Sequence, residues 1–263
     1  MKITLRLIGF SIFFCRLLVA AESFILINGN TSEVIQEFGP NIYKRVTPAS
    51  TFKITLSLIG FDTGILENEI SPVWDFQEGY DNFLETWKSP HAPKTWMENS
   101  CVWFSKILSY QLGIEKFQNY LSLFEYGNQD LSSGLVKPGT LNPPWISSSL
   151  KISPKEQVNF IQKMVSGMLP ISHNAFEMTK KILMKEELPE GWELYGRTGL
   201  GTDILEDRKQ KRIRWFIGWI EKDKDFFPFA YQMRASTVDL NEAIPKVKKY
   251  LNKFIANADQ QPS

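Results

Sequence analysis

The fold of this 263-residue chain is decided by residues 48–54, Pro48-Ala49-Ser50-Thr51-Phe52-Lys53-Ile54. Ser50 and Lys53 stand at positions i and i+3, so on a helix their side chains share one face. A serine hydroxyl is a weak nucleophile near neutral pH and needs a base within hydrogen-bond reach. A lysine amine becomes such a base when burial lowers its pKa. The stretch therefore predicts a nucleophilic Ser50 with Lys53 as its base.

The residues around this pair favour a buried lysine in a helix that starts just before Ser50. Thr47 followed by Pro48 is typical of a helix N-cap and a first-turn proline, so we predict a helix over residues 48–59. Ser50 would lie in the opening turn, where free N–H groups and the helix dipole stabilise a developing oxyanion. Apolar neighbours would surround the Lys53 amine: Phe52, Ile54, Leu56, Leu58 and Ile59.

Two later strings decide how the first one is interpreted, because a serine three residues before a lysine occurs in many ordinary helices. They are Ser100-Cys101-Val102 and Arg197-Thr198-Gly199. S-x-x-K, a second serine motif and a K-T-G string form the signature of serine β-lactamases and penicillin-binding proteins. Ser100 has a plain alternative role as a helix N-cap.

The composition is that of an ordinary globular protein and favours no nucleic-acid partner. Hydrophobic residues make up 43% of the chain and charged residues 22%, and the length suffices for one large domain. The formal net charge is +1, and it becomes −2 without the first 21 residues, which hold three basic and no acidic side chains. Neither value is typical of a protein that binds nucleic acid.

Residues 1–21 have the pattern of a secretory signal peptide. Lys2 and Arg6 form a basic start, a mostly apolar segment follows, and Val19-Ala20-Ala21 is suited to cleavage. An uncleaved anchor or a buried first helix is the alternative, although Arg16 interrupts the apolar segment. The pattern predicts a periplasmic protein with no stable membrane association after signal removal.

Cysteine and histidine are scarce, which limits the chemistry to be expected. Cys15 lies in the predicted signal peptide, so Cys101 is left as a small, buried, apolar residue. His91 and His173 are the only histidines, and no Cys/His cluster has metal-ligand spacing. The shortage of histidine favours a lysine base over a histidine base and predicts no metal site.

The order of the predicted elements indicates an α+β fold. Strands are predicted over residues 23–28, 32–38, 192–198, 212–221 and 226–233, and helices over 48–59, 101–112, 114–124, 153–165 and 241–256. A hairpin tip is expected at 203–210, and loops with short helices at 61–99. This order predicts one antiparallel sheet built from both chain ends, flanked by helices, with a mainly helical subdomain inserted. We expect a single catalytic domain over 22–263, with a helical subdomain at roughly 62–190 and a sheet subdomain at 22–61 and 191–263.

The chain resembles class D (oxacillinase-type) serine β-lactamases of the penicillin-recognising serine enzyme superfamily. The resemblance covers nearly the whole chain after residue 21 and rests on residues 48–54, Ser100-Cys101-Val102-Trp103, Tyr126-Gly127-Asn128, Trp145 with Leu150-Lys151-Ile152-Ser153, Tyr195-Gly196-Arg197-Thr198-Gly199 and Gly218-Trp219. The Tyr-Gly-Asn string and the tryptophan separate class D from class A. The resemblance implies a β-lactamase/transpeptidase-like fold, hydrolysis of the lactam amide of penicillin-type antibiotics, and a role in antibiotic resistance.

The resemblance also implies the catalytic roles. Ser50 would form the acyl-enzyme, and Lys53 would react with carbon dioxide to become N6-carboxylysine, the general base of both steps. Trp145 would hold that carbamate with its indole N–H, or would be only a core aromatic residue. Ser100 would relay a proton to the leaving nitrogen. No cofactor beyond carbon dioxide or bicarbonate is expected.

The implied substrate-binding set is Val102, Arg197, Thr198, Gly199 and Leu200. Val102 would form an apolar wall beside the modified lysine. The backbone N–H groups of Ser50 and Leu200 would form the oxyanion hole, whose donors are commonly worth several kcal/mol in the transition state.

Two positions depart from the family pattern. Arg197 stands where the family usually has lysine, which keeps the charge but replaces a point charge with a planar fork. Asn241 stands where the family commonly has an arginine that grips the substrate carboxylate. We therefore expect Arg197 to act mainly on substrate binding, with Arg234 as the next candidate. Tyr126 is open between proton transfer and a structural loop, and Gly-Asn turn chemistry favours the loop.

Two other functions fit the sequence less well. A penicillin-binding homologue or sensor-like protein would be acylated with little turnover, and a non-catalytic interaction protein of the same fold would not react. The retention of Ser50, Lys53, Ser100 and Trp145 argues against the interaction protein. The expected partners are β-lactam small molecules, and a homodimer stays open.

Overall fold

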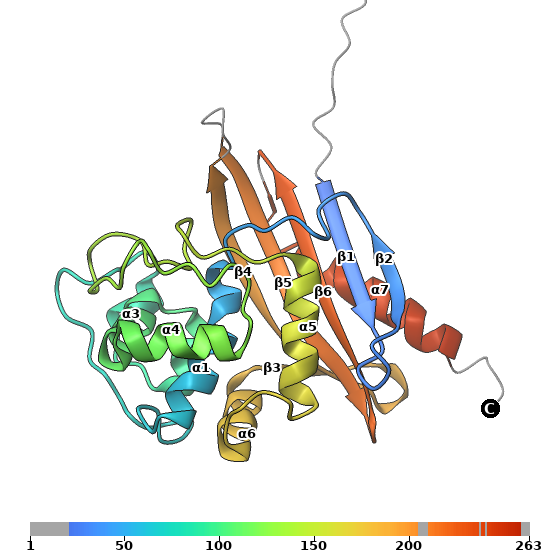
Figure 1. Ribbon diagram of the computed structural model, residues 1–263, viewed down its shortest axis with the longest axis horizontal. Coiled ribbons are helices and arrows are strands. Elements are labelled where there is room, and N and C mark those ends of the chain that lie inside the picture. The colour runs from blue at the N-terminus through green and yellow to red at the C-terminus, as the bar shows by residue number, and fades with distance from the viewer. Residues whose placement is uncertain (1–20, 205–209, 237, 240, 259–263) are drawn as a thin grey trace, which may run out of the picture.

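The computed structural model describes residues 21–204, 210–236, 238–239 and 241–258. The six strands of these residues form one antiparallel sheet in the order β2-β1-β6-β5-β4-β3 (Figure 1). The strands are β1 (Ala21–Ile27), β2 (Val34–Phe38), β3 (Met184–Glu187), β4 (Glu193–Ile204), β5 (Gln210–Lys222) and β6 (Asp225–Ala235).

Most helices lie between the second and third strands in sequence. The α-helices are α1 (Lys53–Asp62), α2 (Pro93–Asn99), α3 (Val102–Leu112), α4 (Ile114–Leu123), α5 (Pro154–Val165), α6 (His173–Ile182) and α7 (Ala243–Ala258). Short 3₁₀ turns add η1 (Ala49–Phe52), η2 (Glu85–Lys88) and η3 (Pro189–Gly191). In Figure 1, α7 lies on one face of the sheet, whereas α5 and the other helices lie on the opposite side.

Helices on both faces explain why the buried parts of β1, β5 and β6 are largely continuous apolar runs instead of alternating ones. In β1, Ile25 and Ile27 belong to the core shared with the inserted helices, and Phe24 and Leu26 belong to the core beneath α7. All four side chains are buried. The sheet therefore separates two apolar layers.

Both chain ends contribute to the sheet, as the sequence predicts. β1 pairs with the late strand β6, with Phe24 opposite Tyr231, and β2 forms the outer edge beside β1. The first paired residue is Ala21, opposite Arg234. Ala21 is also the last residue of the predicted signal peptide, whose other residues lie outside the described part of the chain.

The predicted start of α5 is confirmed. Ser153 Oγ accepts a hydrogen bond from the Glu156 N–H, and the Glu156 carboxylate accepts one from the Ser153 N–H at 2.9 Å. This capping box satisfies two backbone donors that the helix itself leaves free. α5 then packs across β1 and β6.

The predicted ends of β4 and β5 are wrong. β4 continues to Ile204 and β5 starts at Gln210, so Asp203 and Gln210 belong to strands and not to a loop. The remaining residues of the predicted hairpin tip, 205–209, lie outside the described residues.

Sequence analysis also missed α6 and β3. β3 is a polar segment, Met184-Lys185-Glu186-Glu187, that pairs with Glu193–Gly196 of β4. Its backbone hydrogen bonds need no apolar side chains, so the hydrophobic pattern gave no signal. The sequence predicts that the sheet subdomain starts again at residue 191. In the structure the chain returns to the sheet earlier, at residue 184, because β3 belongs to it.

Within the described residues, no helix has the length and apolar character needed to cross a membrane.

Candidate active site

Ser50 lies in the 3₁₀ turn η1, directly before α1. The predicted helix over 48–59 thus starts with a tighter turn and runs on to Asp62. The predicted N-cap role of Thr47 is wrong, because its hydroxyl donates to the Trp145 carbonyl at 2.8 Å and makes no cap bond. The Ala49 N–H donates to the same carbonyl at 2.9 Å, and Ala49 has a positive φ of 50°. Long-range bonds therefore shape the turn that presents Ser50.

Ser50 and Ser100 are in direct contact. The Ser100 hydroxyl donates to Ser50 Oγ at 2.8 Å, and both residues are half-buried. Ser100 ends α2 in a left-handed conformation, with φ of 56°, and the N-cap of α3 is Cys101. The N-cap role considered for Ser100 is therefore wrong, and its side chain is free to meet the nucleophile.

The Lys53 side chain is fully buried, and its Nζ has no hydrogen-bond partner. Burial, together with the nearby charge of Arg197, lowers the pKa of this amine from 10.5 to about 7. The five apolar residues expected around Lys53 are all buried: Phe52, Ile54, Leu56, Leu58 and Ile59. Near neutral pH a large share of the amine is unprotonated and suited to act as a base.

Trp145 is joined to the nucleophile turn through both its backbone and its ring. Its carbonyl accepts the bonds from Thr47 and Ala49, and its ring stacks on Phe52 with centroids 5.2 Å apart. The indole Nε1 is buried without a hydrogen-bond partner. Phe52 directly precedes Lys53, so one core holds two buried nitrogens that lack an acceptor. Such orphans are rare in proteins and call for an explanation.

The Tyr126-Gly127-Asn128 segment is a loop that packing and hydrogen bonds hold in place. The Tyr126 ring packs edge-on against Phe52 with centroids 5.2 Å apart, and burial raises the pKa of its phenol. Asn128 ties the loop down, since its side chain donates to the Ser149 carbonyl at 2.9 Å and accepts from the Lys151 N–H at 2.8 Å. A Cβ on Gly127 would lie 2.1 Å from the Lys151 carbonyl oxygen, so only glycine fits there.

The buried side-chain amide of Gln157 also supports the turn that carries Ser50. The Gln157 amide of α5 donates to Thr51 Oγ1 at 3.0 Å, and that hydroxyl donates to the Pro48 carbonyl at 2.7 Å. Sequence analysis missed this contact, which joins residues 106 positions apart. The start of α5 is thereby linked to the turn that carries Ser50.

β4 presents its outer edge to the nucleophile turn. β3 pairs with β4 only as far as Gly196, so the edge from residue 197 onward is not covered by β3. Along this edge the Thr202 N–H donates to Ser147 Oγ at 3.0 Å. Backbone groups of a strand alternate with a period of two, so the Leu200 N–H points to the same edge.

Glycines allow β4 to lie directly on the turn. A Cβ on Gly199 would lie 3.1 Å from both the Pro48 carbonyl oxygen and the Thr51 nitrogen. A Cβ on Gly201 would lie 2.7 Å from a Thr47 side-chain atom. The glycine at the third position of the Arg197-Thr198-Gly199 string is thus explained by close packing of the strand on the turn.

Arg197 is buried, and its guanidinium bonds to main-chain carbonyls. Nη1 donates to the Met97 carbonyl at 2.6 Å and Nε donates to the Ser50 carbonyl at 3.3 Å. The Met97 carbonyl also accepts from the Ser100 N–H at 3.3 Å. Burial, together with the charge of Arg214 on β5, lowers the pKa of Arg197 to about 10. Arg197 therefore joins the segments that carry Ser50 and Ser100.

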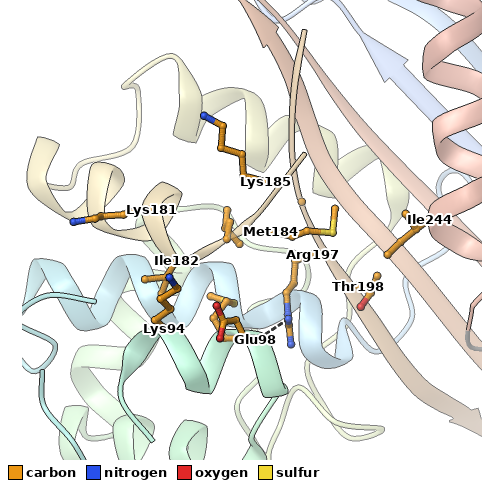
Figure 2. Close-up of a pocket in the computed structure, with 12 residues that line it drawn as sticks. Lys94, Glu98, Lys181, Ile182, Met184, Lys185, Arg197, Thr198 and Ile244 are labelled. Carbon is orange, nitrogen blue, oxygen red and sulfur yellow. Dashed lines mark hydrogen bonds between the residues drawn. The ribbon is translucent and has the colours of Figure 1, made fainter. Parts of the chain in front are cut away.

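Pockets lie at both ends of this edge. One, of about 570 Å³, contains Arg197 and Thr198, together with three lysines and one carboxylate, Glu98 (Figure 2). Its lysines are Lys94, Lys181 and Lys185. Figure 2 shows the Arg197 side chain extending from β4 toward the segment that carries Glu98.

The second pocket, of about 580 Å³, contains Val102 and Leu200. Its apolar lining residues are Phe83, Trp87, Val102, Ile146 and Leu200. All the predicted catalytic and substrate-binding residues thus lie on η1, on α1, at the end of α2, at the start of α3, on the loop before α5, or on β4.

Comparison with known proteins decides the family. Residues 23–256 match the model of the penicillin binding protein transpeptidase domain. The chain is 38% identical over 207 residues to β-lactamase OXA-9 of Klebsiella pneumoniae, and the match covers 76% of this chain and 74% of that protein. It is 37% identical over 198 residues to β-lactamase OXA-1 of Escherichia coli, and that match covers 75% of this chain and 70% of that protein. The chain belongs to the class D β-lactamase family.

Solved structures of this family agree with the fold. The crystal structure of the class D β-lactamase OXA-427 has a TM-score of 0.81 at 33% identity and covers 90% of this chain and 99% of that one. FUS-1 (OXA-85), a class D β-lactamase from Fusobacterium nucleatum subsp. polymorphum, has a TM-score of 0.75 at 27% identity and covers 91% and 93%. The predicted fold and the family resemblance are confirmed.

Arg234, the next candidate for the substrate carboxylate, is held by other groups in the structure. Arg234 bonds to the Asp203 carboxylate at 2.5 Å and to the Asn41 side chain at 3.4 Å, and it is buried. It is therefore a structural residue. Asn241 is exposed, just before α7, and its N–H donates to Asp239.

The described residues contain no group of three or more His, Cys, Asp or Glu side chains arranged to hold a metal ion. Cys101 is buried as a free thiol, and burial raises its pKa from 9.0 to about 12. Cys15 lies outside the described residues.

We predict that Lys53→Met removes a pH dependence of stability that the wild-type protein shows between pH 7 and 9. In the unfolded chain Lys53 keeps its pKa of 10.5 and stays protonated, whereas in the folded chain its pKa of about 7 leaves it mostly neutral. The unfolded state binds more protons, so the free energy of unfolding rises with pH by about 1 kcal/mol per unit from this group.

Urea unfolding in buffer depleted of carbon dioxide measures this slope for both proteins. Cys101 has the opposite effect, but only above pH 9, because its folded pKa is raised from 9.0. Equal slopes for wild type and Lys53→Met between pH 7 and 9 would show that the folded lysine is charged.

Proposed function

We propose that this protein hydrolyses the lactam amide of penicillin-type antibiotics through an acyl-enzyme on Ser50. The observation that carries the proposal is the 2.8 Å hydrogen bond between Ser50 and Ser100, beside a buried Lys53 of lowered pKa. The relatives named β-lactamase, at 37–38% identity, support the same activity.

Acylation requires that the Ser50 proton leave as its oxygen attacks the lactam carbonyl. Lys53 stands one turn further along and in its neutral form is the base nearest in sequence. Ser100 is placed to pass a proton to the lactam nitrogen as the C–N bond breaks, because its hydroxyl already bonds to Ser50 Oγ. A group within hydrogen-bond reach of the reacting oxygen is the geometry that proton transfer needs.

The oxyanion that develops on the carbonyl would be bound by the backbone N–H groups of Ser50 and Leu200. The outward orientation of the Thr202 N–H on β4 supports this role for Leu200, two residues earlier. Preformed donors of this kind commonly contribute several kcal/mol to transition-state stabilisation.

We further propose that Lys53 is N-carboxylated by carbon dioxide or bicarbonate. The buried Lys53 Nζ and Trp145 Nε1 both lack an acceptor, and a carboxylate on the lysine would give the indole one. Only a neutral amine reacts with carbon dioxide, and burial favours that form of Lys53. The residues therefore fit the group, which would supply a general base for acylation and deacylation.

The substrate-binding residues divide between the two ends of the β4 edge. The cationic pocket beside Arg197 and Thr198 suits the carboxylate that every penicillin carries. Gly199 allows the close approach of strand and turn, and Val102 and Leu200 form apolar walls at the other end.

We also propose that residues 1–21 act as a signal peptide and that the mature protein is periplasmic. The basic start with Lys2 and Arg6 and the small residues at Ala20-Ala21 support this location.

Turnover of nitrocefin, with and without added bicarbonate, tests the activity, and Ser50→Ala tests the nucleophile. We expect rapid turnover by the wild-type protein, and no covalent labelling of Ser50→Ala by a fluorescent penicillin. A single stoichiometric burst by the wild-type protein would indicate a penicillin-binding sensor. Labelling that survives in Ser50→Ala would place the nucleophile elsewhere.

Trp145→Phe should slow deacylation by about tenfold or more while acylation changes less. Phenylalanine keeps the stack on Phe52 but removes the indole N–H, and a lost hydrogen bond to a charged group costs roughly that factor. Intact-protein mass spectrometry should show accumulated acyl-enzyme, and bicarbonate should restore part of the turnover. Unchanged turnover without accumulation would make Trp145 a packing residue.

Arg197→Ala should lower kcat as well as raise KM, with a loss of about 10- to 100-fold in kcat/KM. The side chain holds the Ser50 and Met97 carbonyls, so its loss displaces both catalytic serines. Arg197→Lys keeps the charge but cannot donate to both carbonyls in the same way. Its kcat should therefore lie between those of the wild-type protein and Arg197→Ala. A rise in KM alone in Arg197→Ala would mean that the residue acts only on the substrate, as the sequence by itself suggests.

A further inference from the structure

Two long loops contribute to the pocket that contains Val102, whose lining is part apolar and part polar. One runs from α1 to α2 over residues 63–92, and the other from α4 to α5 over residues 124–153. Both approach α3 (Figure 1). The loops contribute to the pocket Asp81, Asn82, Phe83 and Trp87, and Asn142, Ile146 and Ser147, respectively. Only the short turn η2 gives either loop helical structure, so other contacts must fix their positions.

An ion pair between a buried lysine and a partly exposed aspartate joins both loops to α3. Lys106 of α3 is 1% exposed, and its Nζ donates to Asp81 Oδ1 of the first loop at 2.8 Å. The same ammonium donates to the Thr140 carbonyl of the second loop at 3.4 Å. Asp81 Oδ2 accepts from the Gly139 N–H of the second loop at 3.1 Å. One cation and one anion thus close a ring through three segments.

The two loops also meet without any side chain between them. Gly139 has a φ of +75°, and a Cβ there would lie 1.8 Å from the Gly79 carbonyl oxygen. The contact therefore excludes every residue except glycine at position 139.

Burial of the Lys106 ammonium costs free energy, so the partner groups around it must be placed accurately. A buried ammonium loses its hydration and is tolerated only with a well-placed partner. Lys106 lies one turn after Val102 on the same helix. The ion pair therefore fixes the two loops relative to Val102, which lines the proposed site. Loss of the pair removes a contact between α3 and each of the two loops at the same time.

The residues that line the two pockets indicate which part of a penicillin each pocket would bind. A penicillin carries its carboxylate on one ring and its acylamino side chain on the other. If the carboxylate lies at the cationic end beside Arg197, the acyl side chain points toward the apolar end beside Val102 and Leu200. Phe83, which is 85% exposed, and the buried Trp87 offer aromatic surface there.

We propose that Lys106 and Asp81 are positioning residues that set the width of the acyl side-chain pocket. They thereby determine the selectivity between penicillins with large and with small side chains. This inference rests on the proposed function, since it concerns how the same site chooses its substrate.

The test compares kcat/KM for oxacillin, which has a large aryl side chain, with that for 6-aminopenicillanic acid, which has none. Lys106→Met should lower the oxacillin-to-6-aminopenicillanic acid ratio by about tenfold, mainly through KM for oxacillin. Asp81→Asn should shift the ratio the same way and destabilise the fold more, because it leaves the buried ammonium unpaired. The double variant should change the ratio no further than Lys106→Met, since both residues act through one bond.

Gly139→Ala is an independent variant that keeps both charges and forces the loops apart, so it should lower the ratio as well. Lys246→Met is the matched control, because it breaks the partly buried ion pairs of an α7 lysine with Glu22 and Glu242, and these residues do not line the pocket. It should leave the ratio unchanged. If Lys106→Met does not fold, Gly139→Ala carries the test.

The outcomes separate this inference from the proposed function. A wild-type protein that neither turns over penicillins nor labels at Ser50 would refute the function itself. Normal turnover, together with an unchanged ratio in Gly139→Ala and in the folded charge variants, would overturn the positioning role alone.

Discussion

The buried, unpartnered amine of Lys53 is the constraint on which the site depends. An ammonium in this position would lose its hydration and gain no hydrogen bond, so the fold favours the neutral amine. That preference exists only while the surrounding core excludes water. Phe52, Trp145 and the apolar face of α1 form that core, which explains why so much aromatic surface is packed around a single lysine.

The turn that carries Ser50 is fixed by contacts to every part of the molecule around it. The Trp145 carbonyl accepts from Thr47 and Ala49, and the Trp215 indole of β5 donates to the Thr47 carbonyl at 2.9 Å. Gln157 of α5 bonds to Thr51. A strained residue such as Ala49, with its positive φ, persists only where the surroundings impose its conformation. The nucleophile is therefore placed by the sheet, the helices and the loop before α5 together.

The sequence predicts those features whose signal is local. Ser50 and Lys53 lie in one short string, and the capping residues of α5 lie within four positions, so spacing alone indicates their arrangement. The role of Thr47 was beyond such reasoning, because its partner is 98 residues away. The polar strand β3 was missed because its pairing uses only the backbone. A lysine on the apolar face of α3 was the one available signal for the Lys106–Asp81 pair.

Arginine in place of the usual lysine at position 197 has a consequence that neither charge nor motif reveals. A guanidinium has several N–H donors in one plane, and two of them reach the Met97 and Ser50 carbonyls. A lysine has a single nitrogen, so one point would have to serve both acceptors. The same positive charge acts on Lys53 and helps lower its pKa. Arg197 thus links the positions of Ser50 and Ser100 to the protonation of Lys53, and a single substitution on β4 affects all three.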